Sequence, residues 1–456
     1  LEPRRRGYPL DELAADAGLG AEGDERAAVR DAALVHELVG GQEEALRREG
    51  LEPLYREVEL PVTRVLAAME SAGVRIDVHR LGEIAARVRD RADELRDRIW
   101  ELAGGEFVIE SPKQLGQVLF ERLGLPTFRR GKTGWSTDRQ VLRLLEDKHP
   151  IVPLIGQYRE LTKLDNTYLS ALPELVDAHA RLHTTFNQTV AETGRLSSTN
   201  PNLQNIPVRT PLGREIRDAF VAEPGWVLVS CDYSQVELRI LAHCSGEPAL
   251  ADAFRRGEDI HRATAAEVFG MAPPDVDRAT RDRAKAVNFG IVYGISDFGL
   301  SEQLGITRAD ARAYIDAYLA RYPSVRRFID TTIAAAQQDG YVTTLLGRRR
   351  PIPELGGRTV QQRQLGERLA VNTVIQGSAA DIIKAAMVRA HAALDEAGLR
   401  ARLILQIHDE LLLEAPAEEA DRAGSVVRSA MVGAYPLDPP LAVDVGVGET
   451  WLEAKA

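Results

Sequence analysis

The sequence predicts an α+β fold in which two distant parts of the chain contribute to one sheet. Apolar residues at helical spacing dominate residues 57–178 and 248–338, whereas short apolar runs typical of buried strands lead to Asp232 and Asp409. The order along the chain is therefore helix, sheet, helical insertion and sheet again. This order predicts helical segments grouped around a central sheet.

The amino-terminal half is expected to be mainly helical. Residues 1–56 are charged, rich in Ala and poor in recognisable motifs. Apolar residues then recur at helical spacing, with a break near Gly73 and a second helix over 81–102. Ser111 followed by Pro112 is typical of a helix start, and so is the stretch that ends at Asp138.

Strands and helices alternate in the second half. Strands are expected over 182–190 and 227–231, and a largely helical block over 248–338. A short strand over 341–346 and a long helix over 361–394 follow. The apolar runs on both sides of Asp409 predict a hairpin that presents acids at its tip.

The two strand ends carry the chemistry. Two carboxylates brought together repel one another unless a divalent cation lies between them. Asp232 and Asp409 therefore suggest a paired Mg²⁺ site for phosphoryl transfer, with Glu237 on the first turn of the following helix. A buried strand that ends in a solvated turn would explain either aspartate alone, but not both segments together.

A second pattern lies on one predicted helix. Arg281, Lys285, Phe289 and Tyr293 recur at steps of four, which places two cations and then two aromatic rings on one face. Cations suit a triphosphate and rings suit a base. An amphipathic helix with a basic turn in solvent would explain any two of these residues, but not the whole stripe.

Overall charge and targeting signals narrow the class of protein. A net charge of -11 at pH 7 argues against a polyanionic partner, but arginines cluster within 195–217, 278–285 and 348–350, which predicts a basic channel in an acidic body. There is no apolar run long enough for a membrane span and no secretory signal, so a cytoplasmic location is expected.

The first residue is Leu, so a fragment is expected. The Arg- and Ala-rich composition is typical of a GC-rich, actinobacterial-like coding bias.

Longer motifs reveal a resemblance. Residues 232–239, 281–294 and 406–410 resemble, in order and near-correct separation, the three sequence motifs of the DNA polymerase I family. Residues 193–207 and 368–383 resemble the segments with which that family grips primer and template. The likeness extends from residue 57 to the carboxyl terminus.

The resemblance implies a right-hand polymerase with helical thumb, antiparallel-sheet palm and helical fingers. Its expected parts are an inactive remnant of a 3′–5′ exonuclease domain (1–56), thumb (57–178), first part of the palm (179–247), fingers (248–360) and second part of the palm (361–456). The implied activity is template-directed, DNA-dependent extension of a primer 3′-hydroxyl with dNTPs, which releases pyrophosphate and fills gaps in repair and replication. Because the chain begins too late to hold the exonuclease acids, no proofreading is expected.

The resemblance also implies roles for individual residues. Asp232, Asp409 and the backbone carbonyl of Tyr233 would hold two Mg²⁺ ions, with Mn²⁺ as a substitute. The implied catalytic residues are Asp232, Asp409, Glu410 and Lys285, the last as proton donor to pyrophosphate. The implied nucleotide-binding residues are Arg281, Lys285, Phe289, His261, Glu237, Gln235 and Tyr293. The implied DNA-binding residues are Arg195, Asn202, Gln204, Asn205, Arg209, Arg368, Asn372, Gln376 and His408. The expected partners are primer–template DNA and dNTPs, with no membrane, for a nucleoid-associated monomer.

Two rival functions stay open at this stage. A non-catalytic DNA-binding or processivity subunit should have lost a metal aspartate or one of the cations Arg281 and Lys285, and all of these are present. A single-subunit RNA polymerase would share the metal geometry, but Glu237 beside the sugar disfavours a ribose 2′-hydroxyl. For the asparagines and His261, an ordinary turn or helix-start role is a strong alternative.

Overall fold

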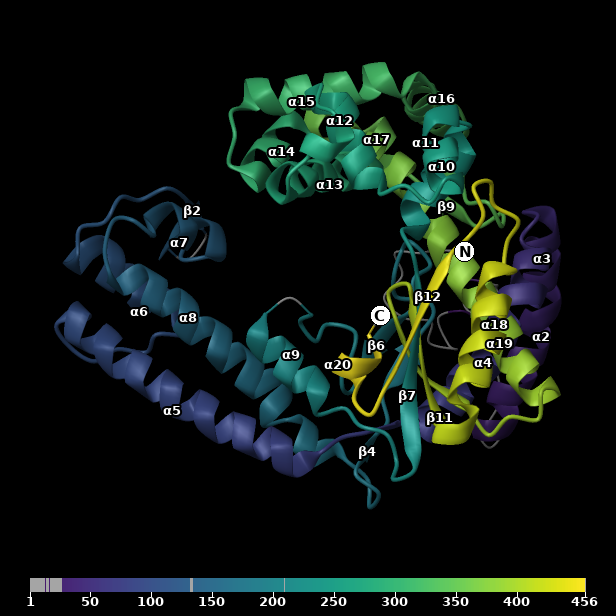
Figure 1. Ribbon diagram of the computed structural model, residues 1–456, viewed down its shortest axis with the longest axis horizontal. Coiled ribbons are helices and arrows are strands. Elements are labelled where there is room, and N and C mark those ends of the chain that lie inside the picture. Colours follow the sequence, from purple (N-terminus) through teal and green to yellow (C-terminus); the bar gives the residue numbers. More distant parts are fainter. Residues whose placement is uncertain (1–12, 14–15, 17–26, 132–133, 209, 456) are drawn as a thin grey trace.

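The structure is a computed structural model that describes residues 13, 16, 27–131, 134–208 and 210–455. At its centre lies a four-stranded antiparallel sheet with the order β10–β11–β7–β12 (Figure 1). Its strands are β7 (Trp226–Tyr233), β10 (Arg402–Ile407), β11 (Glu410–Pro416) and β12 (Val443–Gly448). The prediction that two distant apolar runs share one sheet is confirmed, because β7 pairs with β11 from Trp226 to Asp232.

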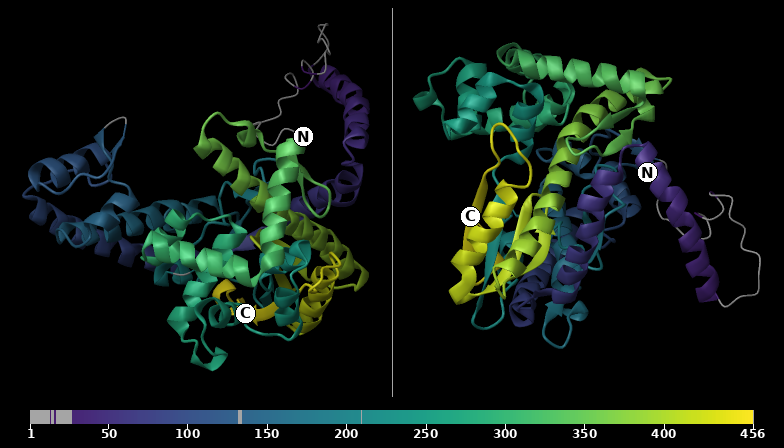
Figure 2. Two further views of the ribbon diagram at one scale, coloured as in Figure 1. Left: turned by 90° about the horizontal axis from the view of Figure 1, so that it is seen from above. Right: turned by 90° about the vertical axis from the view of Figure 1, so that its right-hand side faces the viewer.

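Helices cover this sheet and explain its apolar strands. β11 is buried at every position. Helix α19 (Ala420–Val432) packs on β7 and β12, α18 (Ser378–Glu396) packs on α19 and α4, and α4 (Leu60–Ala72) contacts β10 (Figure 2). Glycine permits the close approach of α19, since a Cβ added at Gly424 would lie 2.9 Å from Val445 Cγ1.

A long helical arm extends away from the sheet (Figure 1). It is built from α5 (Val78–Ala103), α6 (Pro112–Gly116), η2 (Gln117–Arg122), α7 (Arg139–Leu145), α8 (Ile151–Leu164) and η3 (Asp165–Leu169), with the small hairpin β2 (Arg130–Gly131) and β3 (Gly134–Trp135). The predicted helix starts are confirmed, because Ser111 and Asp138 accept backbone hydrogen bonds from Gln114 and Val141. The arm has a separate hydrophobic core at its far end.

A second helical group lies above the sheet in Figure 1. It comprises α10 (Val236–Ser245), α11 (Pro248–Arg255), α12 (Ile260–Phe269), α13 (Arg278–Val292), α14 (Asp297–Leu304), α15 (Arg308–Arg321), α16 (Pro323–Asp339) and α17 (Val360–Asn372). A π-helical turn, η7 (Thr373–Gly377), joins α17 to α18, so the predicted helix over 361–394 is confirmed with one irregular turn.

Further elements lie outside these groups. They are α2 (Ala27–Arg48), α3 (Glu52–Leu54), η1 (Tyr55–Glu59), β1 (Val74–Arg75), η4 (Leu172–Leu175), β4 (Arg181–Leu182), β5 (Thr185–Asn187), β6 (Ser197–Thr199), α9 (Pro211–Asp218), η5 (Pro273–Asp275), β8 (Tyr341–Thr343), β9 (Arg349–Pro351), η6 (Pro353–Gly356), η8 (Ala417–Glu419) and α20 (Trp451–Ala454). In the described part of the chain, no helix is both long and apolar enough to cross a membrane.

Two strand predictions were wrong in extent. Residues 182–190 form no single strand, because β4 pairs with β1 while β5 pairs with β6. The chain changes partners where Thr184 Oγ1 bonds the carbonyls of Thr199 and Pro201. The strand expected over 341–346 ends at Thr343, since the chain turns at Gly347, whose φ is +89°.

The arginine run at 348–350 does not line an open channel, which corrects the prediction for this cluster. Arg348 pairs with Glu59 and Asp381, Arg349 pairs with Glu49 at 2.9 Å, and Arg350 pairs with Glu192. The run therefore joins the amino-terminal helices to the region around the sheet. From the sequence alone, arginines that pair with acids inside the protein look the same as arginines that bind an external polyanion.

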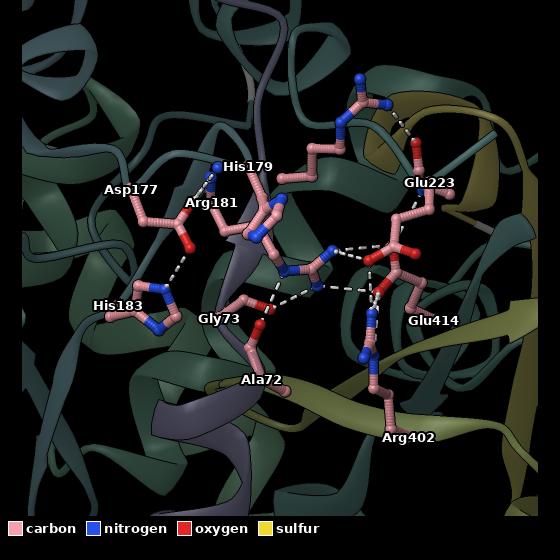
Figure 3. Close-up of polar contacts among 11 residues, drawn as sticks. Ala72, Gly73, Asp177, His179, Arg181, His183, Glu223, Arg402 and Glu414 are labelled. Carbon is pink, nitrogen blue, oxygen red and sulfur yellow. Dashed lines mark hydrogen bonds and ion pairs between the residues drawn. The ribbon is translucent and has the colours of Figure 1, made fainter.

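A buried ionic network lies toward the other end of β7 and β11 from Asp232. Figure 3 shows its residues. Glu414 on β11 is fully buried and accepts hydrogen bonds from Arg181 (2.8 Å) and Arg402 (2.7 Å). Both arginines also bond Glu223, and Arg181 donates to the carbonyls of Ala72 and Gly73 at the end of α4. The network thus ties α4 and β4 to the sheet.

We expect Glu414→Gln to destabilise the protein by about 3 kcal/mol at neutral pH, because it removes the buried one of the two anions that Arg181 and Arg402 share. Burial alone would raise the pKa of Glu414, but hydrogen bonds from Arg181 and Arg402 outweigh burial and hold the pKa below 4.5. The contribution is therefore present above about pH 4.5 and is lost as the pH falls through the folded-state pKa. Urea unfolding at a series of pH values measures this.

The matched control is Glu418→Gln, because the Glu418 side chain is 68% exposed and pairs only at the surface. Its effect should stay within about 0.5 kcal/mol. The cost of Glu414→Gln should shrink toward about pH 3. A cost that stays constant across this range would contradict the ionic explanation.

Candidate active site

The two aspartates lie side by side at one end of the sheet. Asp232 is on β7 directly opposite Glu410, the first residue of β11. Asp409 lies in the tight turn between β10 and β11, where its carbonyl accepts a hydrogen bond from the backbone of Tyr233 at 3.1 Å. His408 enters this turn with a φ of +55°. The expected proximity of the two strand ends is confirmed.

Both aspartates are in surroundings that disfavour their charge. Burial raises the pKa of Asp409 to about 7, with a further contribution from the charge of Glu237 and an opposing one from Arg195. Burial likewise raises the pKa of Asp232 to about 6, and the ammonium of Lys455 opposes this. Poorly solvated carboxylates that repel one another are stabilised by a cation.

This donor set fits Mg²⁺ better than a closed metal cage. Over the described ranges, no three His, Cys, Asp or Glu side chains form a group that could enclose a metal ion. Mg²⁺ sites that use substrate phosphates need only one or two protein carboxylates, and the remaining ligands come from substrate and water. Asp232 and Asp409 could supply such an incomplete site. The Tyr233 carbonyl as a third ligand stays a prediction.

Glu410 is held by protein donors at both oxygens. Its Oε1 accepts hydrogen bonds from Ser230 (2.8 Å) and Trp451 (3.0 Å), and its Oε2 lies 3.2 Å from Lys455 Nζ. The side chain is 3% exposed. These contacts favour a supporting role for Glu410 over direct contact with a metal.

Sequence reasoning missed the last strand and the residue that follows it. Lys455 Nζ lies 3.7 Å from Asp232 Oδ2, and Asp444 on β12 lies opposite Asp232. Valine at every second position from Val443 to Val447 is typical of a strand, but Gly446 and Gly448 weaken this signal. Nothing in the local sequence indicates that Lys455 reaches the aspartates.

Glu237 belongs to the helical group, and its charge acts on Asp409. It is 4% exposed on the first turn of α10, as predicted, and accepts a hydrogen bond from Arg195 at 2.5 Å. Burial and the charge of Glu237 both raise the pKa of the Tyr293 phenol. Gln235 begins this helix with a φ of +55°. Glu237 and Tyr293 therefore lie near one another and near Asp409.

The predicted stripe forms on α13. The rings of Phe289 and Tyr293 stack with centroids 6.2 Å apart, and Lys285 Nζ lies 6.0 Å from the Phe289 centroid. Arg281 is paired with Asp259 at 2.6 Å, so a triphosphate would share this guanidinium with a carboxylate. A cavity of about 320 Å³ is bordered by Phe289, Tyr293 and Arg368. Its size is suitable for part of a nucleotide.

His261 is a buried neighbour of this stripe. Its ring centroid lies 5.7 Å from that of Phe289, and the side chain is 3% exposed. Burial lowers the pKa of His261 to about 4, and the charge of Arg281 adds to this effect. A role as a cationic helper on phosphates is therefore disfavoured, whereas a neutral hydrogen-bond donor remains compatible with the structure.

Some of the predicted DNA-binding residues between 202 and 209 make hydrogen bonds within the protein. Asn202 accepts a backbone hydrogen bond from Gln204 at 3.1 Å, which is the turn role that sequence analysis left open. Gln204 itself donates to the Gln406 carbonyl at 3.0 Å and so connects this loop to β10. Asn205 is exposed. Arg209 lies outside the described residues.

The second predicted DNA-binding group lies along α17 and η7. Arg368, Asn372 and Gln376 recur at steps of four and are half-buried. Asn372 Oδ1 is buried without a hydrogen-bond partner among the described residues, as suits an acceptor that awaits a donor. Gly294, with a φ of +61°, allows Arg368 close to the end of α13, because an added Cβ would lie 3.1 Å from Arg368 Cγ.

Comparison with known proteins now assigns the chain. The model of DNA polymerase family A matches residues 78–453. The chain belongs to DNA polymerase family A. The resemblance found in the sequence is therefore confirmed.

Family A relatives agree over most of the chain. It is 51% identical over 405 residues to "DNA polymerase I, thermostable" of Thermus thermophilus, which covers 88% of this chain and 48% of that protein. It is 49% identical over 429 residues to DNA polymerase I of Geobacillus stearothermophilus, covering 94% and 49% respectively. The chain thus spans about half the length of these curated relatives.

A solved structure confirms the α+β polymerase fold of this family A chain. The POL domain of Pol1 from M. smegmatis, in complex with DNA primer-template and dNTP, matches with a TM-score of 0.95 and 41% identity. The match covers 100% of this chain and 81% of that one.

Proposed function

We propose that this chain is a template-directed, DNA-dependent DNA polymerase that extends a primer 3′-hydroxyl with dNTPs and releases pyrophosphate. The observation that carries the proposal is the junction of Asp232 and Asp409 at one sheet end, next to Glu237. A second supporting observation is the stripe of two cations and two aromatic rings along α13 and its end. The proposed role is gap filling in repair and replication, without proofreading by this segment. The protein would act as a monomer in the cytoplasm, associated with the nucleoid.

Two Mg²⁺ ions are the proposed cofactors, with Mn²⁺ as a substitute. Asp232, Asp409 and the Tyr233 carbonyl would hold them, and the raised pKa values of both aspartates support this assignment. When bound, such ions lower the pKa of an attacking hydroxyl and offset the charge of the leaving pyrophosphate. Glu410 and Lys455 would keep Asp232 in place.

The proposed nucleotide site runs along α13. Arg281 and Lys285 would bind the phosphates, and Lys285 would donate a proton to the departing pyrophosphate. Phe289 would meet the sugar and base, while Tyr293 would stack at the template position and leave it when the helical group closes. The cavity beside Phe289 and Tyr293 supports this arrangement.

Primer and template would bind across the palm. The proposed contacts recognise the minor-groove edge and backbone of the new duplex, where correct pairs present acceptors at similar positions. They comprise Arg195, Asn202, Gln204, Asn205, Arg209, Arg368, Asn372, Gln376 and His408. For Asn202, the amide nitrogen would make this contact, because it can donate to a minor-groove acceptor while Oδ1 accepts the turn bond.

Primer extension tests the proposed function. A labelled primer on a DNA template should grow with dNTPs and Mg²⁺, in an order dictated by the template, and hardly at all with rNTPs. Extension that prefers rNTPs would support the single-subunit RNA polymerase instead. DNA binding without extension would support the non-catalytic subunit.

We expect Phe289→Tyr to improve the use of dideoxynucleotides. Phe289 has no hydroxyl, so the site should depend on the 3′-hydroxyl of the substrate itself, and a phenol could replace this missing group. A gain of about tenfold or more in the ratio of ddNTP to dNTP incorporation corresponds to one hydrogen bond to a charged group. Phe289→Leu, which adds no hydroxyl, is the control and should show no such gain.

A further inference from the structure

A buried polar cluster lies between α12 and α13, and of its members only His261 is among the predicted nucleotide-binding residues. His261, Thr264 and Asn288 are 3%, 0% and 0% exposed. Asn288 Nδ2 lies 3.1 Å from His261 Nδ1 and 3.0 Å from Thr264 Oγ1. Thr264 Oγ1 lies 3.2 Å from Asn288 Oδ1. Because buried polar atoms are costly to leave unpaired, these contacts restrict one another.

The cluster determines which nitrogen of His261 carries the proton. Nδ2 of an amide can only donate, so His261 Nδ1 must accept from Asn288. A neutral imidazole has one donor and one acceptor nitrogen. With Nδ1 as the acceptor, Nε2 carries the proton and is the nitrogen left to donate to another partner.

The position of the imidazole indicates what that partner is. His261 lies beside Phe289, and the cations Arg281 and Lys285 act on it together with the acids Asp259, which pairs with Arg281, and Asp282. Two cations next to a neutral donor favour an anionic oxygen as the group that this site accepts. The proposed triphosphate supplies such oxygens.

We propose that Asn288 is a positioning residue, whose side-chain amide holds His261 in the Nε2–H tautomer so that Nε2 donates a hydrogen bond to a phosphate oxygen of the incoming nucleotide. The nucleotide part of this inference rests on the proposed polymerase function. The tautomer part does not, and it can be measured on the free protein.

Nitrogen NMR of the ¹⁵N-histidine-labelled protein tests the tautomer. The His261 signals are identified by their loss in His261→Gln. We expect the proton on Nε2 in the wild type and its transfer to Nδ1 in Asn288→Asp, where a carboxylate accepts instead of donating. A proton on Nδ1 in the wild type, or an unchanged tautomer in Asn288→Asp, would overturn the inference.

Single-nucleotide incorporation tests the consequence for the substrate. Asn288→Leu should raise the KM for dNTP by about tenfold, the scale of one hydrogen bond to a charged group, with a much smaller change in kcat. On a His261→Phe background, Asn288→Leu should raise the KM no further, because Asn288 acts through His261. Additive effects of the two substitutions would overturn the positioning role.

Thr264→Val is the matched structural control. It removes an equally buried partner of Asn288 but keeps the amide next to His261 Nδ1. The variant should melt at a lower temperature and retain the Nε2–H tautomer. A switched tautomer in Thr264→Val would contradict the assignment to Asn288. If the wild type does not extend primers at all, the polymerase proposal and the nucleotide part fail together, while the NMR result still decides the tautomer.

Discussion

Asp232→Asn and Asp409→Asn should each reduce primer extension by about 10³-fold or more, because each removes a charge that would hold the proposed metal ions of a phosphoryl transfer. Asparagine keeps the shape of aspartate, so the sheet and the Asp409 turn should persist. The rate of single-nucleotide incorporation at saturating dNTP and Mg²⁺ measures the effect. Thermal unfolding of each variant verifies that the fold is retained.

Asp444→Asn is the matched control for these two variants. Asp444 is opposite Asp232 on β12 and carries the same charge, but it is exposed. Its replacement should change the rate by less than about threefold, because Asp444 is exposed and is not one of the proposed metal ligands. Comparable losses in Asp444→Asn and Asp232→Asn would show that overall negative charge, and not metal binding, is responsible.

Glu237→Ala should weaken the selection against ribonucleotides by about 100-fold, the upper part of the range for steric discrimination by a pocket. Glu237 is buried beside Asp409 and restrained by Arg195, so its carboxylate cannot easily move away from a 2′-hydroxyl. The ratio of kcat/KM for dNTP and rNTP, measured with one template base, gives the selectivity.

Glu237→Gln separates size from charge at this position. The amide has almost the same volume as the carboxylate, so this variant should keep most of the selectivity if steric exclusion is the cause. Equal discrimination by Glu237→Ala and the wild type would remove the role of Glu237. A loss in Glu237→Gln as large as in Glu237→Ala would assign the effect to charge.

The main features of the fold could be predicted because local patterns were strong. Apolar runs predicted β7 and the hairpin of β10 and β11, and capping residues marked the starts of α6 and α7. β12 was not predicted, because its glycines weaken the alternation of apolar and polar residues. The 182–190 strand was predicted too long, because side-chain bonds of Thr184 to a distant loop decide where the chain changes partners.

In the candidate site too, local patterns could be predicted from the sequence and tertiary contacts could not. Spacing placed Arg281, Lys285 and Phe289 on one helix face, since helix geometry is local. Partners from distant segments were not foreseen: Lys455 next to Asp232, Asp259 on Arg281, and the acids that neutralise the 348–350 arginines. Such pairs depend on tertiary packing, and one sequence carries no signal for them.

The most direct measurement of the central claim is a crystal structure with Mn²⁺, a primer that lacks its 3′-hydroxyl, a template and the matching dNTP. Anomalous scattering from manganese locates the ions independently of the protein model. The account predicts two manganese peaks coordinated by the carboxylates of Asp232 and Asp409, with the triphosphate extending from them toward Arg281 and Lys285. Manganese bound elsewhere, with both carboxylates free of metal in the nucleotide complex, would contradict it.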